Sequence, residues 1–190
     1  MADALTKNDG WFDHTYIEVV AEDGTGVQLR TKTTSLNMSG GNFDMESNET
    51  FGGAVKRYGA REDYEIGFEG IVSSHQDFDW IFHGANTTDA SITSSSVVDY
   101  RVTLLWTDEA SITAASQAIT TASEASREYY AECNMVSLEK SQNVGENITA
   151  TMTFKTAHED KDGTINFKKE VCGTDSALSA ASAYTSATKW

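Results

Sequence analysis

The sequence predicts an all-β protein: a β-sandwich of antiparallel strands with one short flanking α-helix and several long loops. Two segments carry this prediction, residues 63–73 and 147–155, because each alternates between apolar and polar side chains. The apolar face of the second segment carries Ile148, Ala150, Met152 and Phe154. Period-two alternation with β-branched residues on the polar face is typical of a half-buried strand.

A longer strand with a change of phase precedes the second of these segments. Within residues 127–140 the inward positions are first Tyr129, Ala131, Cys133 and Met135. They then shift by one residue, starting at Val136, which predicts a β-bulge or a strand that switches between neighbouring sheets. A polar loop at 141–146 and a turn at 159–163 lead to a third strand around 165–167. The region therefore predicts a three-stranded antiparallel meander.

The remaining elements are shorter. Residues 15–21 and 27–33 flank a turn and predict an N-terminal hairpin, and 98–106 predicts another strand. A short helix is expected over 74–84, where Ser74 and Asp77 fit an N-terminal capping box. The helix has an apolar stripe of Phe78, Ile81 and Phe82, and Gly84 suits the position after its end.

We expect one β-sandwich domain over 15–172, between an N-terminal arm (1–14) and a C-terminal arm (173–190). Residues 36–53 break the strand pattern and predict a long projecting loop. Long loops in compact domains usually have a function, so its spaced apolar residues are expected to be buried against another subunit; a flexible insertion is the alternative. The segment 108–126, rich in Ala, Ser and Thr, predicts either a poorly packed helix or a mobile loop.

The composition is acidic. The 190 residues include 14 Lys and Arg against 29 Asp and Glu, a formal net charge of −15. This balance argues against a protein that binds nucleic acid by neutralising phosphates. It indicates either an ordinary solvated surface or a surface adapted to high salt, where screening makes self-repulsion tolerable.

The sequence shows no signal peptide and no apolar run long enough to cross a bilayer, so we expect no membrane insertion. Its four histidines fit no metal-ligand spacing, and nucleophile, phosphate-loop and dinucleotide motifs are missing. The run at 160–163 begins like a calcium loop but lacks the later ligands. We therefore expect no enzyme activity, no metal and no cofactor.

Several of these elements together resemble tail tube proteins, the major tail proteins of siphovirus-type tailed viruses. The similarity lies in the strand at 129–138, the Gly-Glu turn at 145–146 and the strand at 148–154. The run at 60–70, followed by the aromatic helix that ends at Gly84, is similar too. The resemblance covers most of 15–172 as a pattern of elements. With the acidity, it suggests a virus of halophilic archaea.

The resemblance implies a virion protein that forms stacked homohexameric rings and conducts double-stranded genomic DNA into the host without binding it. It also implies assembly in the host cytoplasm with other tail proteins: terminator, tape measure and distal tail protein. Glu65 and Glu69, on one strand face, are candidates for the lumen. Candidate ring-to-ring contacts are Met38, Phe43, Met45, Phe51, Trp11 and Trp190. A tail terminator or neck protein has related architecture. The main rival is an adhesin-like or carbohydrate-binding β-sandwich, which would stay monomeric or form a small oligomer.

Overall fold

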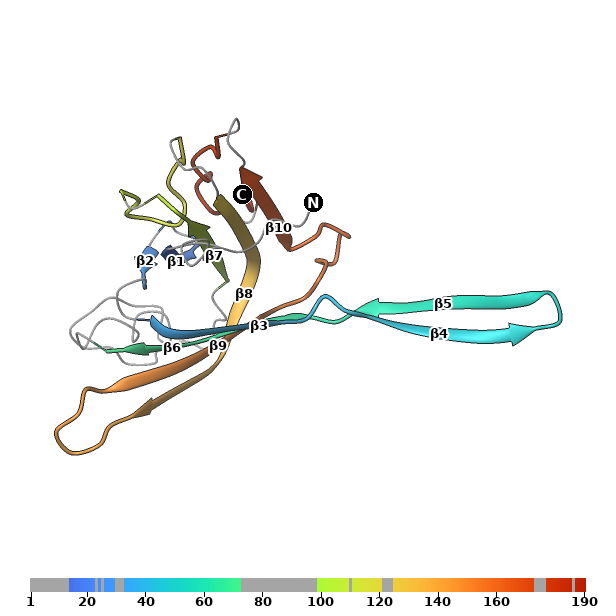
Figure 1. Cartoon of the computed structure of the whole chain (residues 1–190), viewed down its shortest axis with the longest axis horizontal. Coiled ribbons are helices and arrows are strands. Elements are labelled where there is room, and N and C mark those ends of the chain that lie inside the picture. Colours follow the sequence, from blue (N-terminus) through green and yellow to red (C-terminus); the bar gives the residue numbers. More distant parts are fainter. Residues whose placement is uncertain are drawn as a thin grey trace, which may run out of the picture.

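The computed structural model describes residues 14–22, 24, 26–29, 33–72, 99–109, 111–120, 125–172, 177–185 and 187–190. These residues form an all-β fold (Figure 1). The strands are β1 (His14–Ala21), β2 (Gly26–Gln28), β3 (Thr33–Ser39), β4 (Phe43–Thr50), β5 (Gly53–Arg61), β6 (Tyr64–Ile71), β7 (Tyr100–Thr107), β8 (Ala125–Ser141), β9 (Thr149–Thr156) and β10 (Phe167–Cys172). The expected helix at 74–84 and nearly all of the N-terminal arm lie outside the described residues.

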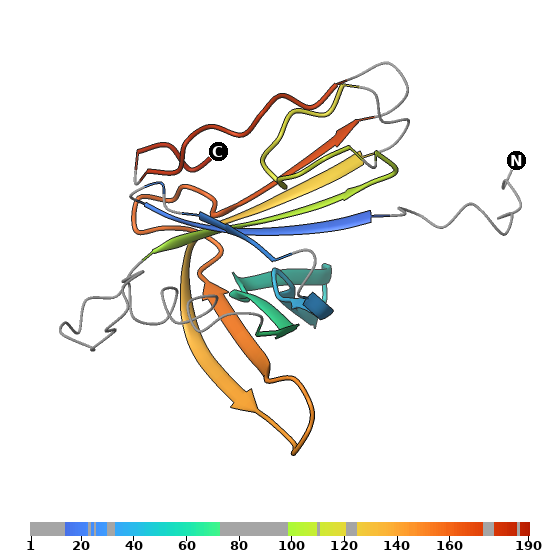
Figure 2. The same ribbon diagram turned by 90° about the vertical axis from the view of Figure 1, so that its left-hand side faces the viewer.

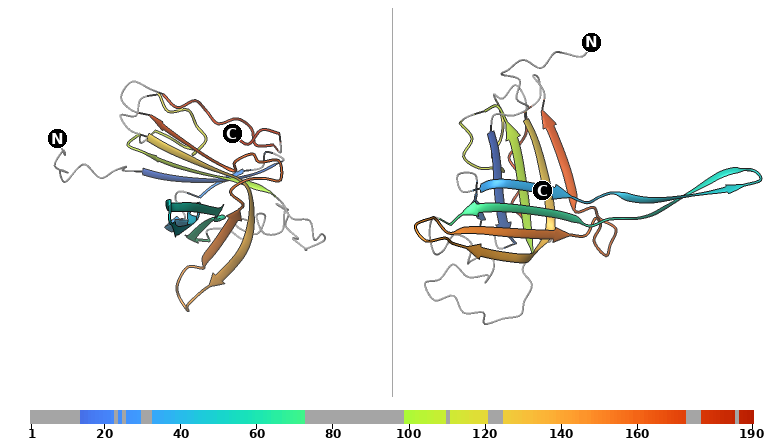
Figure 3. Two further views of the ribbon diagram at one scale, coloured as in Figure 1. Left: turned by 90° about the vertical axis from the view of Figure 1, so that its right-hand side faces the viewer. Right: turned by 60° about the horizontal axis from the view of Figure 1, so that its bottom comes forward.

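The strands build two sheets that share β8, and every pairing is antiparallel. In the first sheet the order is β2-β1-β7-β8-β10, and in the second it is β8-β9-β6-β3. Figure 3 shows the strands of the two sheets crossing at a steep angle. This is the orthogonal type of sheet packing, in which a bent strand forms the corner between sheets.

The corner lies in the middle of β8, whose first half pairs with β7 and β10 and whose second half pairs with β9. Glu132 stands at the bend with a φ of 51°, and the register shifts between Met135 and Ser137. The predicted change of phase is therefore confirmed as a strand that switches sheets. The predicted meander was wrong in one respect: β10 pairs with β8, because the corner turns the first half of β8 away from β9.

The main core fills the space between the two sheets. Its buried members come from strands whose alternation the sequence displays: on β6 and β9 they are Ile66, Phe68, Ala150, Met152 and Phe154. The Phe68 and Phe154 rings stack with centroids 5.6 Å apart. The N-terminal hairpin adds Ile17 and Val19 from β1, which pairs with β2 as expected.

Two irregular segments cover the outer face of the first sheet (Figure 2). Residues 111–120 contain no helix and bury Ile112, Ala115 and Ile119 against Tyr16, so the helix considered for 108–126 is not formed in this described part of the segment. Residues 177–185 and 187–190, which belong to the expected C-terminal arm (173–190), fold back onto the same sheet through Leu178 and Tyr184. Their cover explains why nearly every residue of β7 is buried, on both faces of the strand.

The region expected as a projecting loop, 36–53, consists largely of strands: the end of β3, all of β4 and the start of β5. Together β4 and β5 form a two-stranded ribbon that projects far from the two sheets (Figure 1). All residues of β4 and β5 are exposed. Because neither face of the ribbon is covered, burial imposes no alternation on its sequence, and the pattern of a strand is missing there.

Candidate assembly surfaces

The ribbon leaves the body at a glycine pair. Gly40 and Gly41 have φ values of 108° and 71°, which side chains other than glycine rarely adopt. A Cβ on Gly41 would lie 2.6 Å from the Tyr64 ring, and one on Gly40 would lie 2.0 Å from the Asp63 carbonyl oxygen. The base is held by backbone bonds between Gly41, Glu62 and Asn42. The chain therefore passes from β3 into β4, close beside the start of β6, because Gly40 and Gly41 have no side chain that would clash with Asp63 and Tyr64.

The ribbon has two different faces. The aromatic face carries Phe43, Met45, Lys56, Tyr58 and Arg61, with Ser47 and Glu49 further along the same side, and the opposite face carries Asp44, Glu46, Asn48, Val55 and Arg57. Facing residues follow from the register, in which Met45 pairs with Tyr58 and Glu46 with Arg57. The register shifts at a β-bulge between Phe43 and Met45, so that Phe43 pairs with Arg61 while Met45 pairs with Tyr58.

Contacts within the aromatic face hold it in shape. The rings of Phe43 and Tyr58 lie 5.8 Å apart, and the Arg61 guanidinium lies 3.8 Å over the Phe43 ring. Arg61 also donates a 2.9 Å hydrogen bond to the Gly41 carbonyl. Phe43, Met45 and Tyr58 nevertheless stay about half exposed or more, at 49%, 52% and 63%. Apolar side chains that are ordered and still exposed are typical of an interaction surface.

A second surface is the outer face of the second sheet. Across this face, Glu65, Gly67 and Glu69 of β6 lie opposite Lys155, Thr153 and Thr151 of β9 and opposite Ser39, Asn37 and Ser35 of β3. The Lys155 ammonium lies 2.8 Å from the Glu65 carboxylate, and this hydrogen bond with Glu65 raises the pKa of Lys155. The face is thus polar and only weakly acidic.

The C-terminal strap, residues 177–190, is held to the first sheet by two buried arginines. Arg101 on β7 donates 2.8 Å and 3.4 Å hydrogen bonds to the carbonyls of Ser182 and Lys189. Arg127 on β8 donates a 2.7 Å bond to the Ser179 carbonyl and another bond to the Gln117 carbonyl. Burial lowers the pKa of Arg101. These bonds go to backbone atoms, so the sequence of the strap gives no sign of them.

The end of the strap reaches the corner of β8. Lys189 lies 2.7 Å from an Asp160 oxygen and 3.0 Å from a Glu132 oxygen. Tyr184 is buried, and its hydroxyl accepts a hydrogen bond from the backbone N–H of Glu132. The hydrogen bond from Lys189, with backbone N–H groups, lowers the pKa of Asp160 to about 2. The strap therefore fixes the residue at which the two sheets join.

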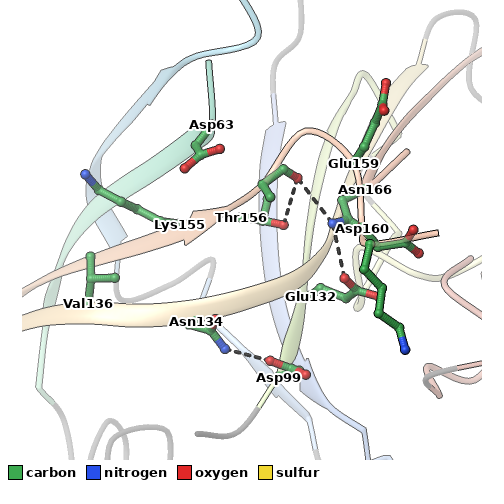
Figure 4. Close-up of a pocket in the computed structure, with 12 residues that line it drawn as sticks. Asp63, Asp99, Glu132, Asn134, Val136, Lys155, Thr156, Glu159, Asp160 and Asn166 are labelled. Carbon is green, nitrogen blue, oxygen red and sulfur yellow. Dashed lines mark hydrogen bonds between the residues drawn. The ribbon is translucent and has the colours of Figure 1, made fainter. Parts of the chain in front are cut away.

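Beside the corner lies a hollow of about 420 Å³ (Figure 4). Its carboxylates are Asp63, Asp99, Glu132, Glu159 and Asp160, and its lysines are Lys155 and Lys161. Asn134 spans part of it with a 2.6 Å hydrogen bond to Asp99. Among the described residues, no three His, Cys, Asp or Glu side chains are grouped closely enough to hold a metal ion. In the same part of the chain, no helix has the length and apolar character needed to cross a membrane.

The structure separates the residues predicted as ring-to-ring contacts. Phe43 and Met45 share the aromatic face, and Phe51 is fully exposed at the tip of the ribbon. Met38 lies on β3, where the Tyr130 hydroxyl is 3.8 Å from its sulfur. Trp190 packs partly buried against the cluster of Val20, Ala131 and Tyr184. Trp11 lies outside the described residues.

Sequence reasoning missed three members of the aromatic face: Lys56, Tyr58 and Arg61. Residues 55–61 show no regular alternation of apolar and polar side chains, because neither face of the ribbon is buried, so the segment reads like a polar loop. Their position opposite β4, once 43–50 is taken as a strand, is what brings them to Phe43 and Met45.

The crossed sheets joined by one bent strand can be compared with known proteins. The sequence itself matches no protein-family model and no curated protein. Its structure is similar to the anti-feeding prophage cap, the AFP tube terminating cap, with a TM-score of 0.51 and 15% identity over 90% of this chain and 97% of that one.

A chain of the six-fold symmetrised anti-feeding prophage baseplate is similar as well. Its TM-score is 0.51 at 8% identity, over 93% of this chain and all of the other (100%). At such low identity the likeness concerns the fold, and the chain therefore has a phage-tail-tube-like fold.

Proposed function

We propose that this protein is a structural subunit of a viral tail tube, built from stacked hexameric rings through which genomic DNA passes. The observation that carries the proposal is the second sheet, which combines a polar outer face with an edge strand at each side. Among the described strands, β3 pairs only with β6, and the second half of β8 pairs only with β9. Free edges of this kind allow the sheets of neighbouring copies to join and close an inner barrel.

The outer face of the second sheet is the proposed lumen lining, with Glu65 and Glu69 at its centre. Ser, Thr and Asn side chains surround them, and Lys155 already pairs with Glu65. Such a surface offers phosphates no cluster of free cations, so DNA would slide along it without the counterion release that drives binding. This is the role that a conduit requires.

The proposed ring assembly, tail partners and virus type go beyond the similarity in fold. One similar structure is a cap that terminates a tube, and the other belongs to a six-fold symmetrised baseplate, which supports assembly as rings with other tail proteins. The partners proposed here are the terminator, tape measure and distal tail proteins. The acidic composition favours a virus of halophilic archaea. The resemblance to tail tube proteins favours one of the siphovirus type, with the protein in the virion tail after assembly in the host cytoplasm.

Negative-stain electron microscopy of the purified protein in molar salt, with light scattering, tests this proposal. Striated tubes with a central hole are expected. Single rings that never stack would instead indicate a terminator or neck protein. A monomer at every salt concentration would overturn the tube assignment and favour the adhesin-like module.

The lumen assignment has its own test, in which Glu65 and Glu69 are both changed to Lys. Six copies per ring would repeat the change at these two positions six times around the lumen, so its effect on the lumen charge is large. We expect tubes to form and to retain DNA in a salt-sensitive way. Tubes that pass DNA as the wild type does would show that these residues lie elsewhere.

A further inference from the structure

We propose that the β4–β5 ribbon docks through its aromatic face, and not its opposite face, onto an acidic surface of a second copy of this chain. The inference rests on the proposed function and adds to it the docking face, its chemistry and the kind of surface that it contacts. The residues proposed to make this contact are Phe43, Met45 and Tyr58, together with the neighbouring Lys56 and Arg61.

The stability of the ribbon is the first step. A two-stranded ribbon without a covered face is at best marginally stable in water. Here all residues of β4 and β5 are exposed, yet the aromatic face is already assembled by the Phe43–Tyr58 and Arg61–Phe43 contacts. A preformed cluster of rings binds at a low entropic cost, because few rotamers remain to be fixed. Both properties indicate that the aromatic face of the ribbon is buried by a binding partner.

The two faces differ in a way that selects one of them. On the aromatic face, Lys56 lies two residues from Tyr58 along β5 and opposite Ser47 of β4, whereas Arg57 lies opposite Glu46 on the other face. On the opposite face the one large apolar side chain is that of Val55, and its neighbours are polar or charged. Aromatic residues and Met are enriched in interface cores, so the aromatic face is the one suited to contact.

Charge indicates the occupant. The ribbon carries Asp44, Glu46 and Glu49 against Lys56, Arg57 and Arg61, which cancel, so the rest of the chain holds the whole net charge of −15. All three positive charges lie on β5, and Lys56 and Arg57 have no ion-pair partner among the described residues. By contrast, Lys155, Lys168, Lys169 and Lys189 pair with carboxylates. The body of a second copy is thus a surface of the complementary sign.

Two pairs of matched variants test the inference, each pair placing the same change on the two faces of β5. Lys56→Glu is compared with Arg57→Glu, and Tyr58→Asp with Val55→Asp, which starts from a similar exposure (63% and 53%). Tube assembly is followed by light scattering and negative-stain microscopy, and folding by circular dichroism. We expect Lys56→Glu and Tyr58→Asp to raise the concentration needed for assembly about tenfold or more, and their partners less than about twofold.

Salt sharpens the same test. The defect of Lys56→Glu should shrink between 0.1 M and 1 M salt, because the screening length falls from about 10 Å to about 3 Å. The defect of Tyr58→Asp should remain, since it removes apolar burial. If wild type forms tubes and both aromatic-face variants do too at the same concentration, the docking face is wrong while the tube stands. If wild type never assembles, the proposed function fails, and the docking inference fails with it.

Discussion

The two-sheet body and the β4–β5 ribbon are made of the same kind of strand, but they are held together differently. Strands of the body bury one face in a common core, where Ile66, Phe68 and Phe154 are almost fully inaccessible to water. The ribbon has no such core, and its order depends on cross-strand pairs and on the glycine crossing at its base. The comparison teaches that stability resides in the body and that the ribbon is available for interaction, so substitutions in the two regions should have separable effects.

Core truncation in the body should give the largest loss of stability. Phe154 contacts both Phe68 and Tyr100, with centroid distances of 5.6 and 6.0 Å, and is completely buried. Phe154→Ala should lower the free energy of unfolding by about 3–5 kcal/mol, measured by urea denaturation. Val55→Ala in the ribbon, the control, should change it by less than about 0.5 kcal/mol. Equal effects would contradict the division between body and ribbon.

Weakening the attachment of the strap should give the next largest loss of stability. Arg127→Met removes the donors to the Ser179 and Gln117 carbonyls while keeping an apolar stem of similar length. Arg127 is fully buried and makes several hydrogen bonds, so we expect its replacement to lower the free energy of unfolding by about 2–4 kcal/mol. Faster proteolysis of residues 177–190 should accompany it. Lys168→Met, at a partly exposed site on β10, is the control and should be nearly neutral. A fully stable Arg127→Met would show that the strap stays in place without the hydrogen bonds of Arg127.

The junction between body and ribbon should respond less strongly. Gly41→Ala places a Cβ 2.6 Å from the Tyr64 ring at a φ of 71°, and should cost about 2–3 kcal/mol. Gly145→Ala also has a positive φ, 84°, but no atom within 4 Å, and should cost only about 1 kcal/mol. Thermal unfolding followed by circular dichroism compares the two. Equal losses would mean that the crossing tolerates a side chain.

The smallest expected effect is a pH dependence at the end of the strap. The folded pKa of Asp160 is about 2 against an ordinary value of 3.8, so its contribution is complete above about pH 4 and is lost as the pH falls towards 2. The difference in melting temperature between wild type and Asp160→Asn should be constant above pH 4 and narrow below it. Glu139→Gln, at an exposed site, is the control. A constant difference down to pH 2 would contradict the pairing of Asp160 with Lys189.

The sequence by itself determined the strands that bury one face. The alternation in 63–73 and 147–155 appears because core packing requires an apolar side chain at every second position. The change of phase near Val136 was visible for the same reason: a strand that changes sheets must also change the side that it buries. Local chemistry also located the positive-φ turn at Gly145.

Only the tertiary structure decided the rest. The strand 43–50 has no buried face and therefore no alternation, so its pairing with 53–61 could be known only from the structure. The strap is held by Arg101 and Arg127 through backbone carbonyls, which every residue possesses, so its sequence carries no signature of docking. Period-two patterns record the burial of side chains; backbone recognition and exposed pairing leave no such record, and both are decided by how the chain folds in space.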